Sequence, residues 1–243
     1  MFPIYKKELQ SFFYTPFAYA ITALFLFMFT YVFTNSIANM DSSMLQFSFA
    51  EIFYSVIALF VYLIPIMTMR TFPDERKFGT EVLLMTTPVN TFKNVIAKYL
   101  ANLTIFAFML VCSLIFPVVT LAYGEVVISQ LFCAYLGFFC WGAMCIALGM
   151  LVSSFTENSI IAAIFGEVVM LLTMFVDEFS NSDFIAQYPG VQSVLYSFAA
   201  QPKFAYFAQS LIRVSDIIFF ISAIVVLLAW TIISIEKRRW NRG

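Results

Sequence analysis

The residue in this sequence best placed to do chemistry is Glu167, which lies in a run of otherwise apolar residues. A charged side chain at the centre of a bilayer costs about 2.5–3.5 kcal/mol or more, so such residues commonly mark ion, proton or substrate pathways. Ser159, Ala163 and Glu167 share one helical face, and Ala162 and Gly166 form a pair of small residues beside it. This spacing turns the carboxylate toward another helix. It predicts either a protonated Glu hydrogen-bonded between helices or a group in a substrate path or gate.

A second stripe of small residues, Cys145, Gly149 and Ser153, recurs every four residues in another apolar run. Small side chains let the backbone of a neighbouring helix approach closely inside a membrane. The stripe therefore predicts a helix-packing seam, and a substrate groove is the alternative.

Several kinds of chemistry are excluded by what the sequence lacks. With no histidine in 243 residues, histidine metal sites, Ser-His-Asp catalysis and an imidazole proton switch cannot be built. A net charge of −1 argues against a nucleic-acid surface. The four cysteines lie in apolar stretches without a CxxC spacing, so we expect them to pack rather than to bind metal or form disulfides. We expect no metal and no catalytic residue.

One polar segment, residues 70–89, is long enough to act as a functional element. Pro73 can open a helix there, the acidic residues at 74 and 75 suit the positive N-terminal end of a helix, and Pro88 would end it. Apolar residues at 82–84 accompany the charges on this short helix. The mixture predicts an element that lies against the membrane or docks a partner, and a solvated connector is the alternative.

The composition places these residues in a membrane protein. Hydrophobic residues make up 62% of the chain and charged residues 11%, against roughly 45–50% and 25% in soluble domains. A helix needs about 20 mostly apolar residues to cross a bilayer, and six segments meet or approach that length. We predict an all-α polytopic membrane protein with a single transmembrane domain over residues 1–243 and spans at about 17–34, 52–69, 95–121, 131–152, 160–176 and 217–235.

The positions of the basic residues predict the orientation of these spans. Eleven of the 13 Lys and Arg residues precede span one, lie between spans two and three or at the start of span three, or follow span six. Because cytoplasmic loops carry the excess of Lys and Arg, we expect both termini and the loop 70–94 to be cytoplasmic. We place the protein in the bacterial plasma (inner) membrane as a multi-pass protein in contact with membrane lipid.

Two further segments have the character of interfacial helices. Residues 1–16 place aromatic residues on one helical face and Lys6 and Lys7 on the other, which predicts an amphipathic helix at the cytoplasmic interface. An ordinary charged flank of span one is the alternative. The external segment 177–216 is aromatic-rich but interrupted by proline and glycine, which predicts short interfacial or re-entrant helices.

At the polar segment the sequence resembles a known family. The matching stretches are IPIMTMR at 64–70, DERKFGTEVLLMTTPV at 74–89, KYL at 98–100, SLIRVSDIIFF at 210–220 and EKRRW at 236–240. They resemble the permease subunits of the ABC-2 transporter family, and within it the gliding-motility-type branch. The resemblance covers nearly the whole chain. Family members usually carry an acidic residue near Leu211 or Ile212, where this chain is apolar.

The resemblance implies an exporter-type half-transporter. Two permeases, identical or different, would pack together and be driven by two cytoplasmic ABC ATPase subunits that bind ATP and Mg²⁺. This chain has no GxxxxGK[ST] phosphate loop, so we expect it neither to bind a cofactor nor to hydrolyse ATP itself. In the family, the N-terminal interfacial helix and the helix after span two meet the ATPase, and the residues carried over as ATPase-coupling contacts are Glu75, Arg76, Gly79, Thr80 and Glu81.

The function that follows from the resemblance is export of an amphipathic or apolar cargo across the bacterial plasma membrane. The alternative is a membrane component of an ATP-driven structural or motility machine that transmits force rather than moving a small solute. A membrane-embedded enzyme has little support, because no paired intramembrane carboxylates and no metal-ligand cluster occur in the sequence.

Overall fold

The computed structural model describes residues 1–38, 49–79, 90–123, 127–180, 200–208 and 211–241. Every regular element in these ranges is a helix, as the composition predicts. In chain order the helices are α1 (Phe2–Tyr14), α2 (Phe17–Ala38), α3 (Phe49–Thr68), α4 (Pro73–Lys77), α6 (Thr91–Ser113), α7 (Ile115–Tyr123), α8 (Ile128–Phe155), α9 (Ser159–Ser180), α12 (Gln201–Ala208) and α13 (Val214–Asn241).

Six stretches of helix among the described residues are long and apolar enough to cross a membrane, which confirms the predicted number of spans. They cover Phe17–Ala38, Glu51–Lys77, Thr91–Ala122, Ile128–Phe155, Ser159–Val176 and Val214–Arg238. The third is broken at Leu114, between α6 and α7. Pro117 follows three residues later and has no N–H to donate into the preceding turn, which accounts for the break.

Aromatic rings fill the centre of the bundle. The ring of Phe138 on α8 lies 5.4 Å from Phe60 on α3 and 5.8 Å from both Phe106 on α6 and Trp141. Phe25 on α2 lies 5.4 Å from Phe60 in an edge-to-face arrangement, a favourable geometry for aromatic pairs. All five side chains are 0–3% exposed. We call these five residues the aromatic core; it holds α2, α3, α6 and α8 together.

The predicted small residues lie where helices meet. A Cβ at Gly149 on α8 would overlap Thr68 of α3, and a Cβ at Gly166 on α9 would come within 3.1 Å of Pro65 of α3. Cys145, Ser153 and Ala162 are also buried. Helices α8 and α9 can therefore approach the C-terminal part of α3 closely because Gly149 and Gly166, two of the predicted residues, have no side chain.

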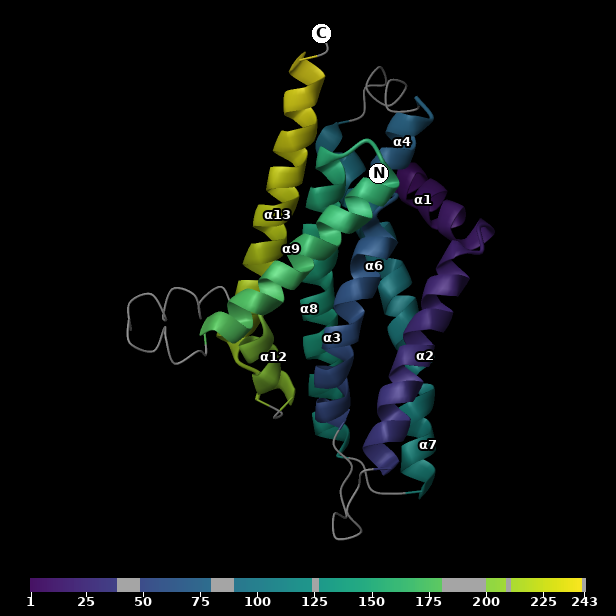
Figure 1. Ribbon diagram of the computed structural model, residues 1–243, viewed down its shortest axis with the longest axis vertical. Coiled ribbons are helices and arrows are strands. Elements are labelled where there is room, and N and C mark those ends of the chain that lie inside the picture. The colour runs from purple at the N-terminus through teal and green to yellow at the C-terminus, as the bar shows by residue number, and fades with distance from the viewer. Residues whose placement is uncertain (39–48, 80–89, 124–126, 181–199, 209–210, 242–243) are drawn as a thin grey trace.

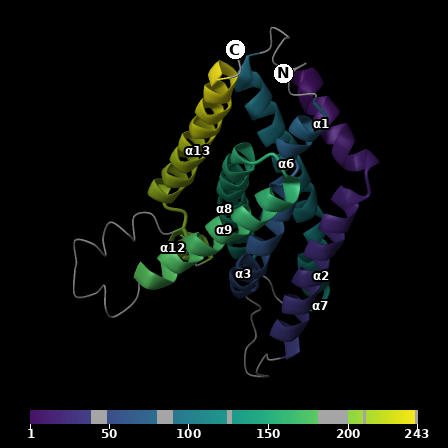
Figure 2. The same cartoon turned by 45° about the horizontal axis from the view of Figure 1, so that its top comes forward.

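Both termini lie at the same end of the bundle, which we call the N/C end (Figures 1 and 2). Helices α1 and α4 also lie there, whereas α7 lies at the opposite end (Figure 1). This arrangement is what an even number of spans requires. It brings α1, α4 and the C-terminal part of α13 to one surface.

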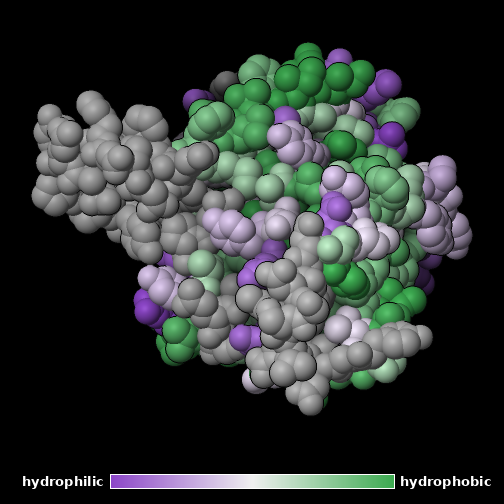
Figure 3. Space-filling model, turned by 60° about the horizontal axis from the view of Figure 1, so that its bottom comes forward, coloured by the Kyte–Doolittle hydropathy of each residue, from purple (hydrophilic) through white to green (hydrophobic). Residues whose placement is uncertain are grey.

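The outside of the bundle is largely apolar. In α9 and in α13 only 17% of the most apolar 18-residue stretch is buried, against 61% of that stretch in α8. Figure 3 shows hydrophobic residues over much of the described surface that faces the viewer. Such a surface suits lipid rather than water, so the chain is a multi-pass membrane protein.

Candidate functional site

Helix α4 is a single short turn at the N/C end. Pro73 stands in its first turn, as predicted, with Asp74 and Glu75 beside it and Arg76 in the last turn. This order of charges matches the helix dipole. The backbone of Gly79 has a φ of +69°, in the left-handed region that favours glycine. The helix that begins at Pro73 therefore ends at Lys77. Pro88, the predicted end, and the apolar residues at 82–84 lie outside the described residues.

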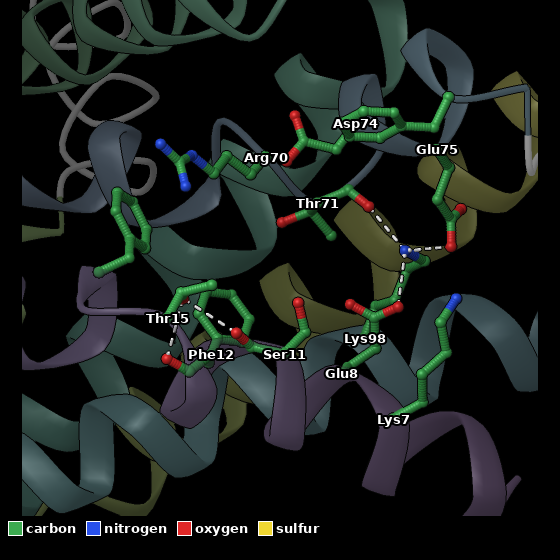
Figure 4. A pocket seen from close by; sticks show the side chains of 12 residues that line it. Lys7, Glu8, Ser11, Phe12, Thr15, Arg70, Thr71, Asp74, Glu75 and Lys98 are labelled. Carbon is green, nitrogen blue, oxygen red and sulfur yellow. Dashed lines mark hydrogen bonds and ion pairs between the residues drawn. The ribbon is translucent and has the colours of Figure 1, made fainter.

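A buried ammonium group links α4 to two other helices. Lys98 on α6 is fully buried, and its Nζ lies 2.8 Å from Glu75 Oε1 and 3.3 Å from Glu8 Oε1 on α1. Nζ also donates a hydrogen bond of 2.7 Å to the carbonyl of Thr71. Figure 4 shows these three acceptors around the ammonium. A buried charge is tolerated when it is paired and hydrogen-bonded in this way.

The backbone just before α4 is fixed by a second buried polar group on α6. Asn102, 1% exposed, donates from Nδ2 to the carbonyl of Lys98 at 3.0 Å and to Thr71 Oγ1 at 3.4 Å. Thr71 thus receives bonds from both Lys98 and Asn102. The link from α3 to α4 is therefore attached to α6 at two points.

Arg76 links α4 to the C-terminal end of α8. Its guanidinium donates to the carbonyl of Ser154 at 2.8 Å and to the carbonyl of Thr156. The carbonyl between them, that of Phe155, accepts a hydrogen bond from Arg238 on α13. The last carbonyls of a helix lack intrahelical partners, and cations stabilise that end of the helix dipole. Two arginines from different helices therefore hold three successive carbonyls at the end of α8.

Asp74 extends the same junction to α9. The hydroxyl of Ser159, the first residue of α9, donates to Asp74 Oδ1 at 2.8 Å. The backbone N–H of Ile160 donates a hydrogen bond of 2.9 Å to Asn158 Oδ1, which caps the start of the helix. We name the set Glu8, Asp74, Glu75, Arg76, Lys98 and Ser159 the α4 junction. Through it one helical turn bonds to α6, α8 and α9, and the ammonium of Lys98 joins it indirectly to α1.

The residues expected to contact an ATPase have mixed positions. Glu75 and Arg76 belong to the α4 junction, so their side chains bind other parts of this chain. Gly79 is exposed and ends the turn. Thr80 and Glu81 lie outside the described residues. Of the three that the structure describes, Glu75 and Arg76 are attached within the chain, and Gly79 is exposed at the surface.

Four members of the α4 junction, Glu8, Asp74, Lys98 and Ser159, were not predicted as site residues. Lys98 was counted among the basic residues that set the topology. A signal for it is present in the sequence, because Val95, Lys98, Asn102 and Ile105 recur at the spacing of one helical face, and all four are buried. Polar residues inside an apolar stripe indicate a buried polar contact. Glu8 carries no comparable signal.

The N-terminal helix α1 packs on protein along part of its predicted apolar face. The hydroxyls of Tyr5 and Thr104 on α6 lie 2.9 Å apart, and the ring of Phe13 lies 5.7 Å from that of Phe108. Lys6 and Lys7 are exposed on the other side, as predicted. The amphipathic pattern therefore corresponds to a helix whose inner face meets α6.

Glu167 lies on α9, eight residues beyond Ser159, or about 12 Å along the helix. Its side chain is half-buried, and Oε1 is buried with no hydrogen-bond partner among the described residues. The interhelical hydrogen bond considered for this carboxylate is therefore absent from the described part of the chain. Glu167 is separate from the α4 junction.

Lys7, Glu8, Arg70, Asp74 and Glu75 are among the residues that line a groove of about 490 Å³ between α1 and α4 (Figure 4). No group of His, Cys, Asp or Glu suited to a metal ion occurs among the residues searched, which are those that the structure describes. Comparison of the chain with protein-family models and with curated proteins finds no match.

Proposed function

We propose that this chain is the transmembrane subunit of an ATP-driven exporter of the ABC-2 type. It moves an amphipathic or apolar cargo across a bacterial plasma membrane, with both termini in the cytoplasm. The observation that carries the proposal is the α4 junction: one charged helical turn at the N/C end is bonded to α6, α8 and α9, and the Lys98 ammonium that it shares joins it to α1.

This geometry suits the transmission of movement. A push on α4 reaches α8 through Arg76 and reaches α9 through Asp74, because each bond joins α4 directly to a helix end. Glu75 and Arg76 act in this proposal as positioning residues that hold α4 to the bundle. Contact with the ATPase falls to Gly79, which is exposed, and to Thr80 and Glu81 of the same segment.

The proposal requires partners that supply the chemistry. Two ABC ATPase subunits bind ATP and Mg²⁺ at the N/C end, and a second permease, the same chain or another, completes the transmembrane part. Glu167 lies on α9, whose outer face is apolar, and serves as a polar point on the cargo path or gate.

The proposal is tested by purifying the full chain with its associated proteins and measuring ATP hydrolysis in liposomes. We expect a copurifying chain with a phosphate loop and ATPase activity that rises with an amphipathic cargo. In Arg76→Gln, ATP hydrolysis by the complex should persist while its coupling to transport falls; Lys77→Gln, the neighbouring exposed residue, is the matched control. Absence of any ATP-binding chain would refute the proposal. ATPase activity indifferent to every cargo would favour the force-transmitting alternative.

A further inference from the structure

The groove between α1 and α4 lies at the level where two apolar helices end. Phe17 is the first residue of α2, and Arg70 stands two residues beyond the end of α3. If α2 and α3 cross the membrane, their ends lie at the boundary between hydrocarbon and lipid head groups. The groove is therefore placed where a phospholipid head group would be.

The groove carries charges of both signs that are not neutralised within it. Arg70 and Lys7 are exposed, and neither forms an ion pair with any residue that the structure describes. The guanidinium of Arg70 lies 4.2 Å from the ring of Phe17, which fixes it at the wall of the groove. The guanidinium of Arg70 is thus available to a ligand beside Phe17, and the ammonium of Lys7 lies at the other end of the groove (Figure 4).

The acidic residue that the groove offers a ligand is Asp74. Glu8 and Glu75 are held by the ammonium of Lys98. Asp74 accepts a hydrogen bond from the hydroxyl of Ser159, which supplies no positive charge. The groove therefore offers cationic and anionic places together, which is the pattern that a zwitterion complements.

We propose that this groove binds the head group of a phospholipid that carries both a phosphate and a primary ammonium, of the phosphatidylethanolamine class. Arg70, held against the ring of Phe17 (Figure 4), binds the phosphate, and Asp74 accepts a hydrogen bond from the ammonium. Half-buried Phe12 and exposed Phe78 supply apolar walls for the glycerol and the first methylene groups. This lipid site is independent of the proposed transport function. It fills the space between α1 and α4 with a component of the membrane itself.

The experiment is native mass spectrometry of the purified full chain in detergent with an equimolar mixture of phosphatidylethanolamine, phosphatidylcholine and phosphatidylglycerol of the same acyl chains. We expect preferential binding of phosphatidylethanolamine, because phosphatidylcholine lacks N–H donors and phosphatidylglycerol lacks the ammonium. Arg70→Gln should weaken this binding about five-fold, the effect of one basic residue at a lipid surface. Arg70→Lys should retain most of it.

Two further variants separate this site from general attraction to lipid. Lys6→Gln removes one positive charge from an exposed residue of α1 that does not line the groove. It should bind phosphatidylethanolamine as the wild type does. Asp74→Asn keeps the acceptor for Ser159 but removes the carboxylate, so it should reduce the preference for phosphatidylethanolamine over phosphatidylcholine. Thermal unfolding of each variant verifies that it folds.

Four results would overturn the proposal. The first is equal binding of phosphatidylethanolamine and phosphatidylcholine by the wild type, and the second is an equal loss in Lys6→Gln and Arg70→Gln. The third is displacement of the lipid by soluble phosphoethanolamine at equal concentration, which would assign the groove to a free metabolite. Unchanged lipid binding in Arg70→Gln together with loss of a copurifying protein would assign the groove to that protein and equally overturn the lipid site.

Discussion

Replacing Lys98 by Met tests whether the buried ammonium holds the N/C end together. Methionine has a similar length and fits an apolar environment, so the change removes the charge with little change in volume. In Lys98→Met the carboxylates of Glu8 and Glu75 lose their shared cation, and the carbonyl of Thr71 loses its donor. Both carboxylates then remain close together without the ammonium that they share.

The expected loss follows from the burial of the three partners. The side chain of Lys98 is 0% exposed, and those of Glu8 and Glu75 are 16% and 13% exposed. Removing one partner of a buried ion pair costs about 3–5 kcal/mol of unfolding free energy. At about 2–4 °C of Tm per kcal/mol for a chain of this size, the variant should melt roughly 6–20 °C below the wild type.

The assay uses the protein's own cysteines. Cys133 and Cys145 are buried and form no disulfide, so a thiol-reactive fluorophore reports their exposure as the purified chain is heated. Lys93→Met is the matched control, because Lys93 is an exposed lysine on the same helix. We expect the Tm of Lys93→Met to stay within about 1–2 °C of the wild type, since exposed substitutions usually change stability by less than about 0.5 kcal/mol.

A double-mutant cycle makes the reasoning refutable. Glu75→Gln should lower the Tm of the wild type, because it removes one side of the pair. In the Lys98→Met background the same change should raise the Tm, because it removes a carboxylate that has lost its cation. If Glu75→Gln lowers the Tm in both backgrounds, or if Lys98→Met melts like Lys93→Met, the buried ion pair does not stabilise this end of the bundle.

Three further substitutions test other contacts. Gly149→Ala should lower the Tm by several degrees in the same thiol assay, because its Cβ overlaps Thr68, whereas Gly79→Asn, at an exposed position with open space, should lower it by less. Arg238→Gln should destabilise the chain by about 1–2 kcal/mol in chemical unfolding, because the Phe155 carbonyl loses a charged donor; unchanged stability would show that this bond contributes nothing. Glu167→Gln should assemble normally and reduce transport in liposomes, and wild-type transport would remove this residue from the cargo path.

The number of membrane-spanning helices could be predicted, because an apolar run of about 20 residues is stable in a bilayer as a helix. Gly149 and Gly166 could be predicted as contact points for a similar reason, since small residues recur on one face. These properties are local in sequence. They require no knowledge of which helix lies next to which.

The contacts of the α4 junction could not be predicted in the same way. Lys98 looks like any basic residue that flanks a span, and only the tertiary packing shows that Glu8, 90 residues earlier, shares its ammonium with Glu75. Arg76 looks like a surface charge, yet its acceptors are carbonyls at the end of α8. Backbone acceptors leave no mark on the sequence, so such bonds become visible only in the structure.

The aromatic core limits where a cargo could travel. Phe25, Phe60, Phe106, Phe138 and Trp141 are almost fully buried at the centre of the bundle, and interiors packed in this way resist rearrangement. A molecule crossing the middle of one subunit would have to displace several of these rings at once. Any route across the membrane therefore runs along the outside of the subunit, where α9 presents its apolar face and Glu167 lies at the edge of that face. In such a transporter the single chain forms one wall of the pathway, and lipid or a neighbouring subunit forms the other.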